Sequence, residues 1–195
     1  MASKRYGRSN RKSRTIENEI LIVCGGKTEK LYFEQHRASL AEIKVVAKQE
    51  NHNPTRVVEY AIKEKQAKKY IQVWCVFDKD DFPDFDSAIS LAKRNDIRCA
   101  FSNEAFEVWY LLHYKYFDNH KDRIKCIKEL EKETGLKYDK VDKEIYNVLK
   151  SRMNKAIENA KKAHQIHMSQ GGLPSTWCSC TTVYQLMEEL NRWKK

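Results

Sequence analysis

The chain has 195 residues, of which 41% are hydrophobic and 33% charged, and its formal net charge is +10. This length and composition are typical of one globular domain with a single hydrophobic core, and they exclude an intrinsically disordered chain. No apolar run approaches the roughly 20 residues that span a bilayer, and the N-terminus lacks the apolar segment of a secretory signal. We therefore expect a cytoplasmic protein that does not associate with membranes.

The positive charge is concentrated at the N-terminus. Residues 1–17 are expected to form a basic, flexible tail, because residues 1–14 contain six Lys or Arg and no Asp or Glu. Residues 1–14 thus supply +6 of the net charge and leave +4 for the rest of the chain. Such an arm either binds nucleic acid electrostatically or is a solvated terminus, and the sequence leaves both interpretations open.

Four short apolar segments predict strands. One of them contains the continuous apolar run Val73–Phe77, as expected for a strand that is buried on both faces of a sheet. The predicted strands span residues 19–24, 43–47, 71–77 and 97–101.

Helix patterns fill the intervals between and after these strands. The first is expected over Glu29–Leu40 with Thr28 as its N-cap, and the second follows Asn53 with Pro54 at its first position. A third begins at Pro83-Asp84, and a fourth spans residues 105–113. Regular alternation of strand and helix predicts an α/β fold, with a Rossmann-like parallel sheet of about four strands flanked by helices over residues 18–115.

Residues 116–195 have helix patterns only. We expect a helix over residues 121–133 that ends at Gly135, and a long helix over about 143–168 that is broken by the segment Gly171–Pro174. A last helix is expected to start near Thr181 or Thr182. This part is predicted to be a helical C-terminal region that packs on the α/β domain.

Three carboxylates follow the third predicted strand directly, at Asp78, Asp80 and Asp81. Crowded like charges repel one another and are costly to desolvate, and a divalent cation bound by carboxylate oxygens resolves that conflict. In open α/β sheets, binding sites lie beyond the carboxyl ends of the strands, where these acids are expected. The alternative is an acidic loop close to the N-terminus of the next helix.

The turn after the first strand contains Gly25-Gly26-Lys27-Thr28 and is followed by Glu29. It lacks the full pattern of an ATP-binding P-loop. Glu29 is expected at the same edge of the sheet as Asp78 and Asp80 if the first and third strands are neighbours. The alternative role of Glu29 is a favourable interaction with the helix dipole.

Three motifs together resemble the RloB family. They are the segments 20–29 (ILIVCGGKTE), 77–82 (FDKDDF) and 101–113 (FSNEAFEVWYLLH), and the segments 181–184 and 188–190 also match. The resemblance extends from about residue 18 over nearly the whole chain. That family has a TOPRIM-like domain related to the nuclease domains of the OLD family, and it is associated with bacterial phage defence.

The resemblance implies a set of site residues. The TOPRIM pattern places an acid directly after the first strand, a second acid four residues later, and a D-x-D after the third strand. The second acid is Glu29 and the D-x-D is Asp78 and Asp80, whereas the position of the first acid holds Gly25. Loss of that glutamate is expected to impair metal binding, catalysis or both.

The implied activity is that of a nuclease that uses Mg²⁺ or Mn²⁺, with Glu29, Asp78 and Asp80 as metal ligands. Glu107 is a further candidate acid, and its alternative role is to pair with a nearby Lys or Arg. Lys27 either contacts phosphate or is solvated, and the same alternatives apply to Lys79.

The resemblance also implies partners, namely nucleic acid and an AAA ATPase of the RloA type. The sequence leaves open whether the substrate is DNA, RNA or tRNA, and whether the chain forms a homo-oligomer. The alternative function is a non-catalytic nucleic-acid-binding or assembly subunit of an ATPase-containing defence complex, which the glycine at position 25 favours. A primase or topoisomerase fragment is a poor alternative, because no long DNA-handling domain is present.

Two further groups of residues have competing interpretations. His164, His167, Cys178 and Cys180 either form a zinc site or belong to a polar helix face with two packed thiols, and the C-x-C spacing is tighter than usual for zinc. Aromatic residues between positions 106 and 117 either form a base-stacking platform or belong to a buried helix.

Overall fold

The computed structural model describes residues 19–40, 44–49, 53–140 and 144–193. The basic tail that we predicted over residues 1–17 lies outside the described residues. Among the helices in the described ranges, none is both long enough and apolar enough to cross a membrane.

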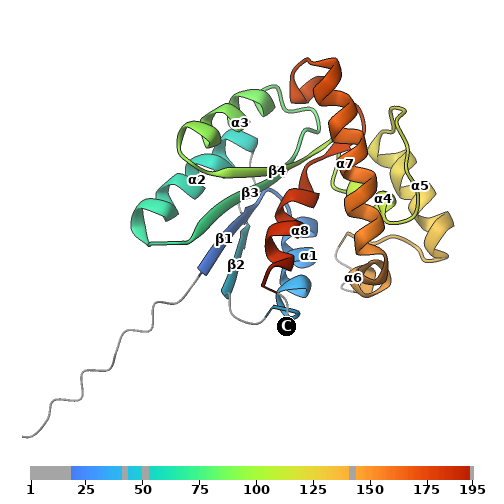
Figure 1. Ribbon diagram of the computed structural model, residues 1–195, viewed down its shortest axis with the longest axis horizontal. Coiled ribbons are helices and arrows are strands. Elements are labelled where there is room, and N and C mark those ends of the chain that lie inside the picture. The colour runs from blue at the N-terminus through green and yellow to red at the C-terminus, as the bar shows by residue number, and fades with distance from the viewer. Residues whose placement is uncertain (1–18, 41–43, 50–52, 141–143, 194–195) are drawn as a thin grey trace, which may run out of the picture.

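A five-stranded sheet with the strand order β2-β1-β3-β4-β5 organises the fold (Figure 1). Its first four strands run parallel, which confirms the predicted α/β class. They are β1 (Glu19–Cys24), β2 (Lys44–Gln49), β3 (Gln72–Asp78) and β4 (Arg98–Asn103).

The fifth strand, β5 (Cys180–Thr181), pairs antiparallel with β4 and was not predicted. We expected a helix to start near Thr181 or Thr182, but α8 begins only at Val183. Thr182 connects the two elements: its main-chain N donates to the carbonyl oxygen of Phe101 at 2.8 Å, and its Oγ1 accepts from the main-chain N of Phe101 at 2.9 Å. A strand of two residues is too short to produce a periodic pattern, so no local signal predicts it.

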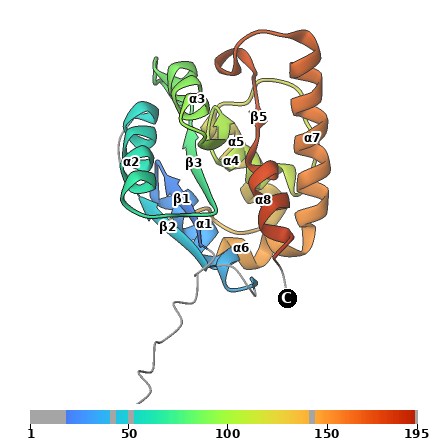
Figure 2. The ribbon, with the colours of Figure 1, turned by 60° about the vertical axis from the view of Figure 1, so that its left-hand side comes forward.

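Helices cover both faces of the sheet. Figures 1 and 2 show α2 and α3 on one side, and α1 and α8 on the other. The helices of the α/β part are α1 (Lys27–Arg37), α2 (Pro54–Ala67), α3 (Phe85–Arg94) and α4 (Glu107–Leu112). Those of the C-terminal region are α5 (Arg123–Thr134), α6 (Glu144–Leu149), α7 (Met153–Gln170) and α8 (Val183–Asn191).

Some predicted helix boundaries are correct and others are not. Asn53 caps α2 by accepting from the main-chain N of Arg56 at 3.1 Å, and Gly135 ends α5 with a left-handed φ of 70°. Thr28 is not an N-cap, because α1 already begins at Lys27 and its N-cap is Gly26. The expected long helix over 143–168 consists of α6 and α7, separated by a 3-10 turn at Lys150–Arg152.

Alternate residues of the buried strands face opposite hydrophobic clusters. Leu21 and Val23 of β1 pack against α2 and α3, whereas Ile20 and Ile22 pack on the other side of the sheet. The latter cluster also contains Trp109 of α4 and residues of the four C-terminal helices. The C-terminal helices therefore share one core with the sheet.

We expect Ile22→Ala to destabilise the protein by about 2–5 kcal/mol, because the side chain of Ile22 is fully buried. Ile71→Ala is the matched control, since Ile71 is 46% exposed and its truncation should cost less than about 0.5 kcal/mol. Unfolding in urea measures both free energies. Equal losses for the two variants would contradict the described core.

Candidate functional site

Four acidic side chains from different parts of the chain line one cavity of about 400 Å³ at the carboxyl end of the sheet. The parallel pairing of β1 with β3 sets Cys24 opposite Val76, so the turn after β1 lies beside the end of β3. The cavity thereby unites predicted residues from all three motifs, namely Glu29, Asp78, Asp80 and Glu107, with Gly25 and Lys27 beside them.

The loop that carries the two aspartates is held by main-chain hydrogen bonds to β4 and the residues after it. Lys79 N donates to the carbonyl oxygen of Ser102 at 2.9 Å, and Asp80 N donates to that of Glu104 at 3.0 Å. Asp80 itself has a φ of 38°, in the left-handed region that aspartate tolerates better than most residues. These contacts fix Asp80 at the cavity.

Glu29 reaches the cavity from the first turn of α1. Its carboxyl group lies against Gly26, where a Cβ atom would come within 2.6 Å of Glu29 Oε2. Glycine at position 26 therefore gives the Glu29 carboxyl group room to lie against the turn. In this position Glu29 is buried beside the other acids, in addition to its favourable place on the helix dipole.

Gly25 lines the same cavity, so the position at which the resemblance implies a glutamate does face the acidic site. Its main-chain N donates to the carbonyl oxygen of Val76 at 2.7 Å and continues the β1–β3 pairing. A Cβ atom on residue 25 would lie 3.3 Å from Cβ of Phe77. The next atoms are the carbonyl oxygen of Val76 and Cα of Phe77, so a larger residue at position 25 requires β3 to shift by a few tenths of an ångström.

One guanidinium group neutralises part of the cluster. Arg123, the first residue of α5, has its Nη2 atom 3.3 Å from Asp78 Oδ2 and 2.8 Å from Asp80 Oδ1. Its Nε atom lies 3.4 Å from Glu107 Oε2. Sequence reasoning missed Arg123, because no local pattern relates it to acids that lie 16 and 45 positions earlier.

Glu107 lies at the candidate site and also pairs with an arginine, so both positions that the sequence left open for it are found. It lines the cavity with the other acids, and it pairs with Arg123. Its second oxygen, Oε1, accepts a hydrogen bond of 2.9 Å from the hydroxyl group of Tyr138, another residue that the sequence did not indicate. These two partners hold the Glu107 carboxylate in a fixed orientation.

The crowding of the acids changes their proton affinities. Burial, and then the charges of Glu107 and Asp80, raise the pKa of Glu29 to about 7, although its own main-chain N–H and Arg123 act in the opposite direction. Burial, followed by the charges of Glu29, Glu107 and Asp80, raises the pKa of Asp78 well above its usual range. Arg123 acts against these increases in pKa but does not cancel them, so the cavity favours an additional cation or bound protons.

The donor atoms of the cavity suit a hard divalent cation. Mg²⁺ usually binds through one or two protein carboxylates, with water and substrate phosphate completing its shell. Asp78 Oδ1 is buried and, within the described residues, has no hydrogen-bond partner. In the same part of the chain, no three His, Cys, Asp or Glu side chains already stand together as a ligand set. Binding of a cation by Glu29, Asp78 and Asp80 would therefore require these side chains to move closer together and Arg123 to move away from them.

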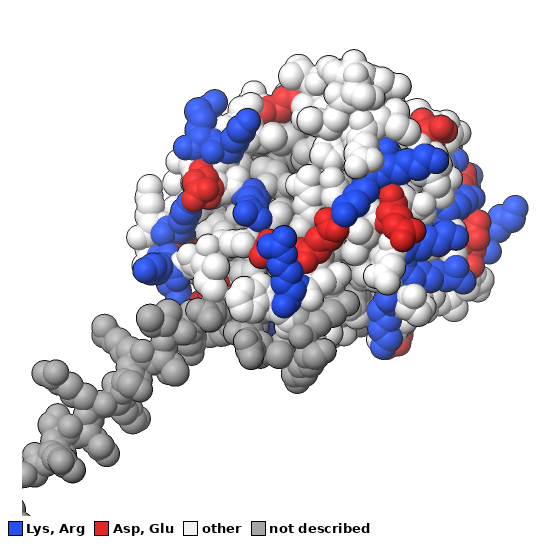
Figure 3. Space-filling model, in the orientation of Figure 1, with Lys and Arg blue, Asp and Glu red and all other residues white. Residues whose placement is uncertain are grey.

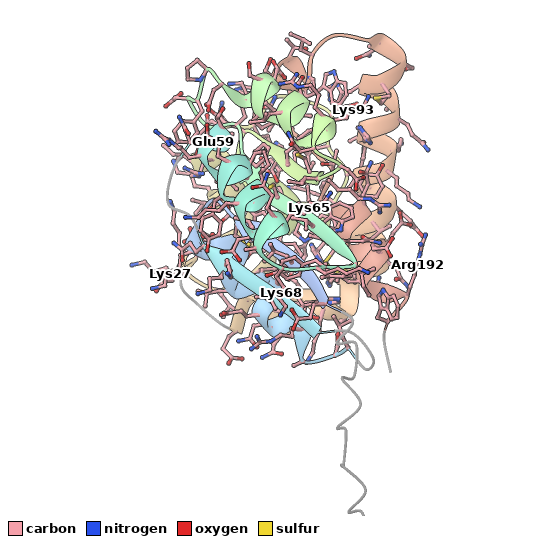
Figure 4. All side chains as sticks on the ribbon, turned by 90° about the vertical axis from the view of Figure 1, so that its left-hand side faces the viewer. Lys27, Glu59, Lys65, Lys68, Lys93 and Arg192 are labelled. Carbon is pink, nitrogen blue, oxygen red and sulfur yellow. The ribbon has the colours of Figure 1, made fainter. Side chains whose placement is uncertain are left out.

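Two lysines line the cavity. Lys27 was predicted and Lys140 was not, and Figure 4 shows Lys27 projecting outward from the molecule. Lys79 is placed differently, because its Nζ atom donates to the carbonyl oxygen of Asp80 at 3.1 Å and so supports the loop. Phe82, which is 39% exposed, also lines the cavity and adds an accessible aromatic ring.

The zinc interpretation is wrong for the described residues. His164 Nδ1 lies 2.9 Å from the Tyr184 hydroxyl group, and His167 Nε2 lies 3.0 Å from the carbonyl oxygen of Cys178. Cys180 is buried in the core, whereas Cys178 is exposed. No zinc ligand set is present among the side chains that the structure describes.

The aromatic residues around α4 belong to the core, so the buried-helix interpretation is confirmed. Trp109 and Tyr110 are buried, as are Phe106 and Phe117. Tyr114, which is half-buried, packs under the guanidinium group of Arg152 at 4.7 Å. These rings do not form an open base-stacking surface.

A second cavity, of about 680 Å³, lies between α3 and α8. Three of its charged residues pair with one another, since Glu189 lies 3.5 Å from Arg98 and 3.2 Å from Arg192. Figure 3 shows basic and acidic side chains side by side on the face that carries α8. No residue of the predicted nuclease site lines this cavity, so we assign the candidate site to the smaller, acidic one.

A family model described as RloB-like protein matches residues 20–190 of the chain. No curated protein matches the chain, and no solved structure matches it. The match covers every acid of the cavity together with Arg123, Tyr138 and Lys140.

We expect the stability of the protein to depend on pH through Glu29. Its folded-state pKa of about 7 lies above the ordinary value of 4.5, so its contribution to stability is fully present below pH 4.5 and is lost as the pH rises through 7. Between pH 5 and pH 8, the free energy of unfolding of the wild-type protein should fall by about 1–3 kcal/mol more than that of Glu29→Gln. Urea unfolding in the presence of EDTA measures both values. Glu34→Gln, on the same helix, is the control and should follow the wild type. If the free energies of unfolding of wild type and Glu29→Gln changed in parallel with pH, Glu29 would have an ordinary pKa and the prediction would be wrong.

Proposed function

Because the chain belongs to the RloB-like protein family, we propose that its acidic cavity is a metal-dependent site for cleaving nucleic-acid phosphodiester bonds, weakened by the glycine at position 25. Asp78 carries this proposal, since its buried Oδ1 atom has no hydrogen-bond partner within the described residues and stands among three more acids. A divalent cation is the ligand that satisfies such an oxygen without adding a proton.

Asp78, Asp80 and Glu29 are the residues that would hold the cation. When bound, Mg²⁺ or Mn²⁺ supplies an activated water molecule and neutralises charge on the scissile phosphate. The chain's own basic residues at the cavity, Lys27 and Lys140, attract the anionic backbone and position it over the carboxylates. Tyr138 and Arg123 orient Glu107, so that its carboxylate keeps a constant position toward the reacting phosphate.

The family resemblance implies a biological setting, in which the chain acts in an anti-phage defence system together with an AAA ATPase partner of the RloA type. The cavity is compatible with DNA, RNA and tRNA, since all three present the same phosphodiester group.

A second candidate function is a non-catalytic nucleic-acid-binding or assembly subunit of such a complex. Two observations favour it. Gly25 supplies no carboxylate where the resemblance implies one, and Arg123 already pairs with three of the four acids. In this alternative, the ion pairs of Arg123 have a structural role and the cavity holds no cation.

We expect Gly25→Glu to increase cleavage of DNA, RNA or tRNA in the presence of Mg²⁺ or Mn²⁺ by at least about 100-fold, because it adds the missing carboxylate at a position that faces the cavity. The assay compares purified wild type and variant on all three substrates, each with and without the ATPase partner.

Gly25→Gln is the matched control, because it introduces nearly the same volume beside Phe77 without a charge and should remain at the wild-type level. Asp78→Asn in the Gly25→Glu background should abolish the gain. Absence of cleavage by Gly25→Glu on every substrate, with the fold intact by circular dichroism, would favour the non-catalytic alternative.

We expect Lys27→Gln and Lys140→Gln each to weaken oligonucleotide binding. Each variant should also reduce the slope of log K against log salt concentration by the amount that corresponds to the loss of about one phosphate contact. Fluorescence anisotropy at several salt concentrations measures both quantities. Lys93→Gln is the control, because Lys93 lies on α3 and does not line the acidic cavity (Figure 4). Equal affinities for all three variants would exclude the two lysines from the interface.

A further inference from the structure

The position of Arg123 is not explained by its own helix. Arg123 is the first residue of α5, where the helix dipole disfavours a positive charge. The acids compensate for this placement, because Asp78 and Asp80 contact the guanidinium group from the loop after β3, and Glu107 contacts it from the start of α4. Arg123 is therefore the positive charge that joins these two segments at the cavity.

Arg123 occupies oxygens of two carboxylates that would hold a metal ion. Its Nη2 atom contacts Asp78 Oδ2 and Asp80 Oδ1, at 3.3 and 2.8 Å, whereas Asp78 Oδ1 has no hydrogen-bond partner within the described residues. Mg²⁺ binds carboxylate oxygens at about 2.1 Å, so an ion on Asp78 and Asp80 would stand close to the guanidinium group and repel it. Metal binding to these two carboxylates therefore weakens their ion pairs with Arg123.

We propose that Arg123 and a divalent cation are alternative counter-ions of Asp78 and Asp80, so that metal binding displaces the guanidinium group from them. This inference rests on the proposed function in one respect, that the cavity takes a metal ion. The displaced group remains attached to α5 at the mouth of the cavity. There it is available to bind a phosphate oxygen, for which the planar guanidinium is well suited.

Mn²⁺ binding to the full-length protein tests this exchange. We expect Arg123→Met, which keeps much of the side-chain volume but has no charge, to bind Mn²⁺ at least ten-fold more tightly than the wild type, as measured by electron paramagnetic resonance or calorimetry. Lys128→Met removes the same charge from an exposed position on the same helix and should bind Mn²⁺ like the wild type. Unchanged or weaker Mn²⁺ binding by a folded Arg123→Met variant would overturn the proposal.

A second readout uses the wild-type side chain and does not depend on the folding of the variant. In ¹⁵N NMR spectra, the Nη2–H signal of Arg123 should exchange slowly with water in the metal-free protein, because Nη2 is paired with Asp78 and Asp80. Saturating Mg²⁺ should shift this signal and accelerate its exchange. A signal that stays unchanged under saturating Mg²⁺ would overturn the exchange of counter-ions.

These measurements separate this inference from the nuclease proposal. Tighter metal binding by Arg123→Met, without cleavage by any variant, would contradict the nuclease and leave the exchange intact. Metal-dependent cleavage combined with equal Mn²⁺ affinities for Arg123→Met and wild type would support the nuclease and contradict the exchange of counter-ions.

Discussion

Repulsion among carboxylates at the carboxyl end of a parallel sheet is the constraint that shapes this protein. The pairing of β1 with β3 brings Glu29 beside Asp78, and both groups are buried. Burial strengthens the repulsion, because the charges are less screened than in water. A cation from outside the α/β part, Arg123, relieves a portion of it and thereby ties the start of α5 to the sheet.

This arrangement gives the C-terminal region two kinds of attachment. Apolar side chains of its helices join the core on one face of the sheet, which supplies most of the stabilisation without directional preference. Arg123 and Tyr138 add polar contacts that depend on position, since they meet Glu107 at its two oxygens. The helices thus contribute to the shape of the cavity as well as to the stability of the fold.

The sequence predicted the elements better than it predicted the site. Continuous apolar runs and capping residues such as Asn53 are local signals, and they led to the four parallel strands and to the start of α2. The sequence also named the acids that line the cavity: Asp78 and Asp80 from their place after a strand, Glu29 from its place after a turn, and Glu107 through the family resemblance. Arg123 was missed because its role comes from distant residues that only the folded chain brings together. The split between α6 and α7 was missed for a related reason, as no Gly or Pro marks it.

The short strand β5 affects how the chain folds during its synthesis. It covers part of the outer edge of β4 with residues that come 79 positions later in the sequence, because Thr181 bonds to Ser102. During synthesis, that edge exists long before its cover has been made, and an uncovered strand edge can recruit a strand from another chain. Residues 180–181 of β5 therefore protect this edge only once they have been synthesised. Until then, the edge of β4 in the growing chain can pair with a strand of another chain.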